Sequence, residues 1–234
     1  GLLIDTGCSR TAEELVAFLR NRPPAMAVNT HFHEDHVGGN SAVMECFGID
    51  IYAHPDSIPR IAERPSLYPY QELVWGYPRP TVVKPIHDVI RTMHHEFTVV
   101  EIPGHCEGHI ALMELSRGWC FSGDIFTRER VKFIRPEENA RAQISSMKKI
   151  LSIAGSGLTL FTALGRVEHD GRRALEECIA NMEALGHRVK ALSGEGCSTG
   201  EIVEIVFGGE SGFSDLTNGQ FSSKNLVASL LAEE

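Results

Sequence analysis

Short apolar runs alternate with amphipathic segments along most of the chain, which predicts strands and helices in mixed order. The apolar runs are rich in Val, Ile, Leu and Phe, as in buried strands, whereas the amphipathic segments repeat their apolar positions with helical spacing. This alternation predicts an α/β protein. Strands are expected near 1–5, 25–30, 49–53, 97–102, 110–115, 119–123 and 158–163, and helices near 11–21, 40–47, 55–63, 138–154, 170–186, 199–207 and 222–232.

Two of these helices begin with capping sequences. Thr11 is followed three residues later by Glu14, the pattern of a capping box in which each side chain bonds to the backbone N–H of the other residue. Asn40 comes directly before the periodic residues 41–47 and is expected to be their N-cap.

The most informative polar cluster follows the apolar run at 25–29. Residues 31–36 read His-Phe-His-Glu-Asp-His, so three imidazoles stand beside acidic side chains within six positions. Burying these polar atoms without partners would be costly. Neutral imidazole and carboxylate oxygen are ligands of zinc and, less exclusively, of iron or manganese. The cluster therefore predicts a metal site, with a polar loop of coincidental histidines as the alternative.

The spacing within this cluster suggests two ligand positions. His31 and His33 project from the same side beyond the strand, because alternate residues share a face. Asp35 and His36 lie past a sharp bend and reach a second point close by. One short loop can thus supply two ligands to each of two adjacent metals, and the glycines at 38–39 remove side chains where the backbone passes near them.

Two later loops carry further ligand types at strand ends. Residues 103–109 (PGHCEGH) follow the predicted strand 97–102, and residues 122–124 (SGD) follow a second short apolar run. Loops at strand ends commonly carry catalytic groups on a rigid scaffold.

These motifs, together with Ile-Asp-Thr-Gly at 4–7, resemble in kind and order those of metallo-β-lactamase-superfamily metallohydrolases in the glyoxalase-II-like branch. The resemblance covers residues 1 to about 185 and is far more specific for the superfamily than for the substrate. It implies a four-layer αββα sandwich over 1–186, a C-terminal helical tail over 187–234, and one or two earlier N-terminal strands that the sequence lacks.

The resemblance also implies a set of metal ligands. They are His31, His33 and His105 for the first metal, Asp35 and His36 for the second, and Asp124 bridging both. Asp124, and Asp35 where it is not committed to a metal, would act as catalytic residues that orient or deprotonate the attacking water. No cofactor other than the metals is expected.

Two more residues are implied to support these ligands. His109 would hold the ligand loop through a hydrogen bond, which is close to a purely structural role. Asp5 would accept a hydrogen bond from a ligand imidazole and so select its tautomer. A turn residue in Asp-Thr-Gly is the alternative for Asp5.

One position departs from the family pattern. The family supplies a last histidine to the second metal from the turn after the final core strand, and Leu164 stands there in this chain. His169 is a candidate weak ligand five residues later, against the alternative of a solvated histidine before a helix. We therefore expect one firmly bound zinc ion and a second metal that is weak or absent; iron or manganese would suit the same ligands.

Composition narrows the partners and the compartment. The 234 residues are 42% hydrophobic and 23% charged, which is ordinary for a globular protein. A net charge of −9 disfavours nucleic acid and anionic membranes, so a small-molecule substrate is expected. No apolar run approaches a membrane-spanning length. The six cysteines lack paired spacing and are interpreted as free thiols, which favours a cytoplasmic location.

Two segments outside the metal motifs are open to more than one interpretation. Residues 64–80 combine four prolines with aromatic side chains, and could form a lid, a homodimer contact or a loop packed on its own domain. The basic residues in 128–135 would hold an anionic substrate or form a solvated charged strand.

The function predicted from these features is hydrolysis of a small ester, thioester or lactone by a metal-bound hydroxide. The first alternative is an oxidoreductase resembling mononuclear-iron persulfide dioxygenases, which need only His31, His105 and Asp124 of the ligands named here. The second is a metal-binding, non-enzymatic ligand-binding module. The retention of every other ligand argues against this second alternative, because clustered polar groups are costly to keep.

Overall fold

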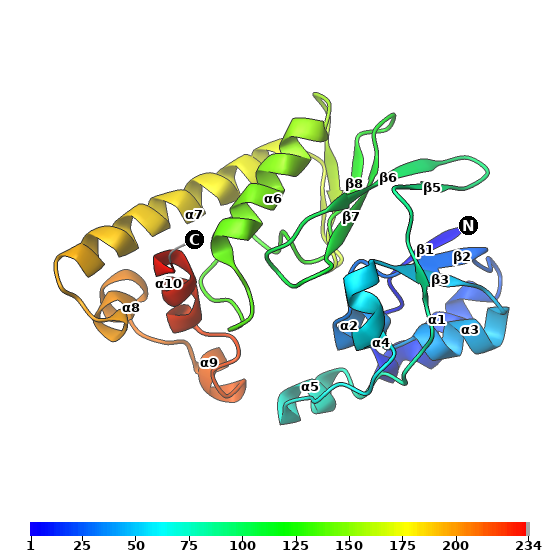
Figure 1. The fold of residues 1–234 in the computed structure, drawn as a ribbon, viewed down its shortest axis with the longest axis horizontal. Helices are drawn as coiled ribbons and strands as arrows, with labels where there is room; N and C mark the ends of the chain where they lie inside the picture. Colours follow the sequence, from blue (N-terminus) through cyan, green and yellow to red (C-terminus); the bar gives the residue numbers. More distant parts are fainter. Residues whose placement is uncertain (233–234) are drawn as a thin grey trace. The chain divides into compact units, whose positions relative to one another are not determined.

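The computed structural model describes residues 1–232, whose helices and strands are shown in Figure 1. The strands are β1 (Leu2–Ile4), β2 (Met26–Val28), β3 (Ile51–Ala53), β4 (Lys84–Pro85), β5 (Val89–Arg91), β6 (Glu96–Glu101), β7 (Ile110–Glu114), β8 (Trp119–Phe121), β9 (Thr159–Phe161) and β10 (Val167–Glu168). The α-helices are α1 (Ala12–Leu19), α2 (Glu34–Val37), α3 (Asn40–Phe47), α4 (Ile58–Ile61), α5 (Pro69–Val74), α6 (Ala140–Ile153), α7 (Gly171–Gly194), α8 (Thr199–Phe207), α9 (Gly212–Leu216) and α10 (Ser223–Leu231). The 3-10 helices are η1 (Ser9–Thr11) and η2 (Pro55–Ser57).

The chain folds into two compact units. The first comprises residues 1–101 and 107–123, and the second comprises 102–106 and the residues from 124 onward. The boundary predicted between 186 and 187, which separates the sandwich from the C-terminal helical tail, is not the boundary between these two units and stays a prediction.

The first unit contains two sheets of different kinds. Strands β1 to β4 are parallel and neighbour one another in sequence order, with Ala27 opposite both Leu3 and Ile51. Strands β5 to β8 form successive antiparallel pairs. β7 is buried along its whole length, as its unbroken apolar start would require.

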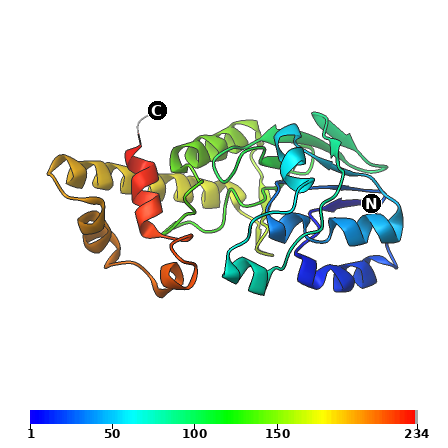
Figure 2. The same cartoon turned by 60° about the horizontal axis from the view of Figure 1, so that its bottom comes forward.

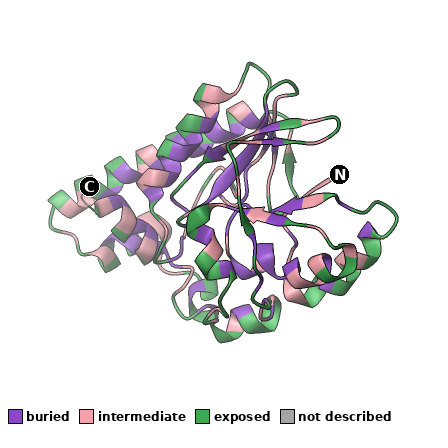
Figure 3. Ribbon diagram, turned by 45° about the vertical axis from the view of Figure 1, so that its right-hand side comes forward, coloured by how far each residue is buried: buried purple, intermediate pink, exposed green. Residues whose placement is uncertain are grey.

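Two hydrophobic clusters hold the first unit together. Successive strand residues point to opposite faces, so Ala27 and Val28 of β2 enter different clusters. Val28 packs with Phe97 and Ile110 between the two sheets. Ala27 packs with Val37 of α2 on the other face, in a cluster that also takes in residues of α3 and α4. Figure 3 shows the buried residues concentrated on the strands and on the inner sides of the helices.

The second unit is mainly helical. α6 and α7 lie side by side, and α10 packs against both of them and against α8 (Figure 2). Side-chain caps define where these helices begin: Asn139 accepts from the Ala142 N–H, Asp170 from the Arg173 N–H, and Ser198 forms a capping box with Glu201. β9 and β10 form a short antiparallel hairpin in the same unit.

The α/β class, the strand-rich first part and the C-terminal helices agree with the prediction. Each predicted strand is present, and the predicted helix at 55–63 consists of η2 followed by α4. The predicted end of the helix at 170–186 is wrong, because α7 continues to Gly194. Six short strands and α-helices, and the 3-10 helix η1, were missed because a few residues are too short for a periodic pattern. The strands and α-helices are β4, β5, β10, α2, α5 and α9.

Both predicted caps in the first unit are wrong. α1 begins at Ala12 without a side-chain cap, and the Thr11 hydroxyl donates instead to the Cys8 carbonyl at 3.4 Å. Asn40 is the first residue of α3 rather than its N-cap. Its amide forms a buried pair with Asn29, in which Asn40 Nδ2 donates to Asn29 Oδ1 at 2.8 Å.

One carboxylate secures the start of the last helix. Glu210 Oε1 accepts from the Ser222 hydroxyl at 2.5 Å and from the Lys224 N–H at 2.8 Å, and Oε2 accepts from the Ser223 N–H at 3.0 Å. Partial burial opposes ionisation, but these donors outweigh it and hold the pKa of Glu210 below its usual value.

We expect Glu210→Gln to lower the free energy of unfolding by about 1 kcal/mol at pH 7, because the anion stabilises the helix N-terminus. The pKa of Glu210 is lower in the folded protein, so this contribution is present above the unfolded-state pKa of about 4.3 and is lost as the pH falls through the folded-state pKa. Urea unfolding of the variant and of the exposed control Glu195→Gln measures it. A difference that stays constant below pH 4 would contradict this assignment.

Candidate functional site

The loop after β2 brings three imidazoles together in the first unit. His31 is 0% exposed, His33 5% and His36 4%. Nε2 of His31 lies 3.0 Å from Nδ1 of His33, and one ring nitrogen of His31 lies within 4.8 Å of one of His36. The single turn of α2 carries His36 back towards His31, so that the two ring centroids lie 3.9 Å apart.

Asp5 orients these rings from the end of β1. Nδ1–H of His36 donates to Asp5 Oδ2 at 2.8 Å, and the Thr30 N–H donates to Oδ1 at 2.7 Å. The Thr30 hydroxyl donates to Oδ2 at 2.8 Å and lies 3.0 Å from Nδ1 of His31, from which it can accept. An ionised carboxylate only accepts, so both imidazoles donate through Nδ1, and in the neutral form of each ring the lone pair is on Nε2.

This donor set fits a divalent transition metal. Two nitrogens bound to one tetrahedral zinc ion lie about 3.3 Å apart, given Zn–N bonds of about 2.0–2.1 Å. The 3.0 Å separation between the ring nitrogens of His31 and His33 is close to that value. Buried neutral imidazoles with a fixed tautomer suit zinc and iron. The individual ligand roles stay predictions.

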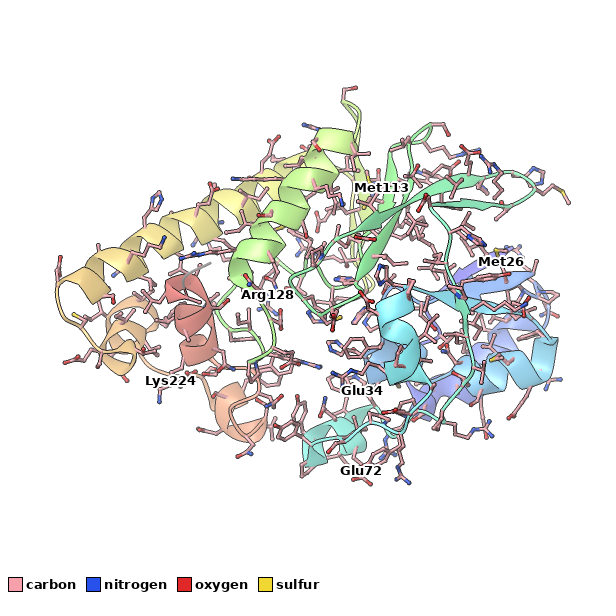
Figure 4. The ribbon with its side chains drawn as sticks, viewed as in Figure 1. Met26, Glu34, Glu72, Met113, Arg128 and Lys224 are labelled. Carbon is pink, nitrogen blue, oxygen red and sulfur yellow. The ribbon has the colours of Figure 1, made fainter. Side chains whose placement is uncertain are left out.

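The two acidic residues of α2 differ in their surroundings. Asp35 is 26% exposed and its Oδ2 lies 3.9 Å from Nε2 of His36. Glu34 is only 4% exposed and accepts a hydrogen bond from Gln71 Nε2 at 2.6 Å. The sequence did not predict a buried role for Glu34, because a single acidic residue between His33 and Asp35 gives no sign of its burial or of its partner. Figure 4 labels Glu34 on α2 and Glu72 on α5.

The aromatic segment 64–80 is attached to its own unit through α5. Besides the contact from Gln71, the Arg10 guanidinium donates to the Glu72 carbonyl at 2.8 Å, and the Ser9 hydroxyl donates to the Trp75 carbonyl at 2.9 Å. These contacts favour a loop packed on its own domain. The lid and homodimer interpretations stay predictions.

His109 depends on the glycine before Asp124. The His109 side chain is buried, and its ring centroid lies 4.8 Å from that of His31. Gly123 has a φ of +50°, and a Cβ atom placed on it would lie 2.3 Å from Nε2 of His109. The absence of a side chain at this position therefore makes room for the His109 ring.

The second unit holds the other predicted ligands. Nε2 of His105 lies 3.5 Å from Oδ2 of Asp124, and Nδ1 of the same ring lies 3.3 Å from Oε2 of Glu138. All three side chains are at most 16% exposed. Sequence reasoning missed Glu138, which it placed at the start of a helix with nothing to connect it with His105.

The remaining candidates of the second unit have no comparable setting. Leu164 is 62% exposed in the turn between β9 and β10, and His169 is exposed in the turn before α7. The role of His169 as a ligand stays a prediction. Burial, with the nearby carboxylates of Asp124 and Glu138, raises the pKa of the Cys106 thiol, which favours a packing role.

The basic side chains of residues 128–135 are not all exposed to solvent. The Arg128 guanidinium lies over the Phe133 ring, with 5.6 Å to its centroid, and Figure 4 labels this residue. Arg135 is 5% exposed and lies over Phe221 at 5.0 Å. The prediction of a solvated charged strand is therefore wrong for Arg135, because its side chain is buried and its guanidinium lies over the Phe221 ring.

All six cysteines are free thiols, as predicted. Within the described residues, none of the helices has the length and apolar character needed to cross a membrane.

A family model described as the metallo-beta-lactamase superfamily matches residues 1–164. A probable metallo-hydrolase, YybB of Bacillus subtilis, is 32% identical over 127 residues, which are 53% of this chain and 56% of the relative. A hydroxyacylglutathione hydrolase of Bdellovibrio bacteriovorus is 31% identical over 116 residues, 49% of this chain and 40% of the relative. The chain thus spans about half the length of these curated relatives.

Solved structures share the fold. A beta-lactamase domain protein from Burkholderia ambifaria superimposes with a TM-score of 0.76 at 19% identity, over 98% of this chain and 76% of that chain. The protein TTHA1623 in a di-iron-bound form gives a TM-score of 0.58 at 27% identity, over 72% of this chain and 83% of that chain.

We expect Gly123→Ala to displace His109 or the backbone before Asp124, because the added Cβ meets the ring at 2.3 Å as well as requiring a positive φ. Gly165→Ala is the matched control: its φ is +72° and nothing lies within 4 Å of its Cβ position. Thermal unfolding should show a loss at least about 2 kcal/mol larger for Gly123→Ala than for the control. Equal losses would mean that His109 does not need this space.

Proposed function

This chain belongs to the metallo-beta-lactamase superfamily, and we propose that it is a metal-dependent hydrolase of a small ester, thioester or lactone. Relatives named as hydroxyacylglutathione hydrolases support an enzyme of the hydrolase class. The non-enzymatic binding module stays the alternative that a protein without metal binding would favour. The buried histidine cluster oriented through Asp5 is the observation that carries the proposal.

The proposed ligand set follows the order of the motifs. It comprises His31, His33 and His105 for a first metal, Asp35 and His36 for a second, and Asp124 shared by both. Two observations support it: the imidazoles of the first unit lie together with selected tautomers, and His105 and Asp124 lie together in the second unit. His109 and Asp5 are proposed to support these ligands.

A divalent metal held by these residues would supply a hydroxide nucleophile near neutral pH and would polarise the scissile carbonyl. The protein's own side chains would orient the ligand imidazoles and the attacking water, and would accept the proton of that water. Asp5 accepts the Nδ1 proton of His36, and the Thr30 hydroxyl accepts that of His31. In the neutral rings the Nε2 lone pairs are then available to bind the metal. Asp35 and Asp124 are proposed to orient the attacking water and accept its proton.

Thioesters come first among the proposed substrates, because several relatives are named hydroxyacylglutathione hydrolases. The net charge of −9 supports a small molecule rather than a nucleic acid. Zinc is the proposed metal. The di-iron form of TTHA1623 makes iron the competing candidate, so the metal has to be measured before activity is interpreted.

We expect the zinc-loaded protein to hydrolyse at least one member of a thioester, ester and lactone panel. His31→Ala should lower the rate at least about 100-fold, because even the partners of metal ligands cost 10–100-fold when removed. The exposed His187→Ala is the control and should retain full activity.

An absence of hydrolysis above the His31→Ala background would reject the proposal. Stoichiometric iron after expression without added metal, together with oxygen uptake that depends on a persulfide, would instead assign the persulfide dioxygenase-like activity. Elemental analysis and an oxygen electrode distinguish these two results.

We expect one metal to stay bound through dialysis and a second to be weak or absent, because Leu164 replaces the last histidine ligand of the family. Leu164→His should raise the affinity for the second metal about 10-fold or more. The exposed position should tolerate the change within about 0.5 kcal/mol of stability. His169→Ala should leave the metal content unchanged. Two tightly held metals in both the wild type and His169→Ala would show that Leu164 does not weaken the second site.

A further inference from the structure

Glu138 is a buried carboxylate beside a predicted ligand. Its side chain is 8% exposed, and its Oε2 lies 3.3 Å from Nδ1 of His105. Both of its oxygens are held: Oε1 accepts from the Arg135 N–H at 2.9 Å, and Oε2 accepts from Gln143 Nε2 at 2.5 Å. The orientation of this carboxylate is therefore set by the protein around it.

The loop that carries His105 is fixed against the start of α6, directly after Glu138. The Asn139 N–H donates to the Gly104 carbonyl at 2.7 Å, and the Ser146 hydroxyl donates to the Pro103 carbonyl at 2.6 Å. Gly104 has a φ of +129°, and a Cβ atom placed on it would lie 2.4 Å from the backbone nitrogen of Gln143. The loop and the helix thus approach too closely for a side chain, and this approach sets the distance between His105 and Glu138.

The two nitrogens of His105 face two different carboxylates. Nδ1 faces Glu138, and Nε2 lies 3.5 Å from Asp124. Each carboxylate can accept a proton from the nitrogen that faces it, but Nδ1 lies nearer to Glu138 than Nε2 does to Asp124, and Asp124 is itself a proposed metal ligand. A neutral His105 with its proton on Nδ1 therefore pairs with Glu138 and leaves the Nε2 lone pair on the side of Asp124. The other tautomer would present an N–H group where a metal has to bind.

The first unit shows the same arrangement independently. Nδ1 of His36 donates to the Asp5 carboxylate, and His31 reaches the same carboxylate through the Thr30 hydroxyl. In the second unit, Glu138 would accept the Nδ1 proton of His105, as Asp5 accepts that of His36 in the first unit.

We infer that Glu138 is a positioning residue that selects the Nδ1–H tautomer of His105 and fixes the orientation of its ring. The inference deepens the proposed function and rests on it for the claim that His105 binds a metal. Its tautomer claim concerns the protein alone and stands on the contacts of the second unit.

Nitrogen-15 NMR of the imidazole groups in metal-free protein at pH 8 tests the tautomer directly. His105 should be protonated on Nδ1 in the wild type and should become a mixture of tautomers in Glu138→Ala. Glu137→Gln is the matched control, because Glu137 is 46% exposed and lies 3.9 Å from Arg135. An Nε2–H tautomer in the wild type, or an unchanged tautomer in Glu138→Ala, would overturn the inference.

Competition between the protein and a chelator for zinc alone measures the consequence for binding. Glu138→Ala should weaken zinc binding 10–100-fold, the usual effect of removing the hydrogen-bond partner of a ligand histidine, whereas Glu137→Gln should change it less than about twofold. Gln143→Ala removes one support of Glu138 and keeps the carboxylate. If Gln143→Ala weakened zinc binding as much as Glu138→Ala at equal loss of thermal stability, the effect would be structural and the inference wrong.

Failure of the proposed function would look different. A wild-type protein that binds no zinc would reject the proposed metal centre, while the tautomer measurement would still decide the role of Glu138. If Glu138→Ala does not fold, Glu138→Met keeps a side chain of similar length and removes both acceptor oxygens, and an unaltered tautomer together with unaltered zinc affinity in that variant would count against the inference.

Discussion

The arrangement of the histidine cluster depends on the carboxylate of Asp5. This residue has a φ of +57°, a left-handed conformation that costs about 1 kcal/mol for a residue other than glycine. In that conformation its oxygens receive the Thr30 N–H, the Thr30 hydroxyl and Nδ1 of His36. Three imidazoles can be buried together because this one acceptor decides where two of their protons lie.

The sequence was sufficient for the parts of the molecule whose patterns are local. Apolar runs predicted β6 and β7, and the spacing of His31, His33 and His36 predicted a cluster that the first unit contains. The partners of those residues are not local. Glu138 stands 33 positions from His105, so only the folded chain brings them together.

The wrong helix caps have a common physical cause. Thr11 and Asn40 carry side chains that suit an N-cap, but a capping side chain can equally bond elsewhere when folding offers a partner. The Thr11 hydroxyl donates to the Cys8 carbonyl in a turn, and the side-chain amide of Asn40 donates to the buried side-chain amide of Asn29. In the second unit, Ser198 and Glu201 do form a capping box at the start of α8.

The contact between Glu34 and Gln71 joins the histidine loop to a segment 37 positions away. The carboxylate is 4% exposed and the amide 6% exposed, so a change at either position alone takes a buried hydrogen bond from the other. During divergence the two sites should therefore be replaced together, and an apolar residue at 34 should be accompanied by an apolar residue at 71. Pairwise covariation of these columns in an alignment would record the packing of α5 on this loop in sequences for which no structure exists.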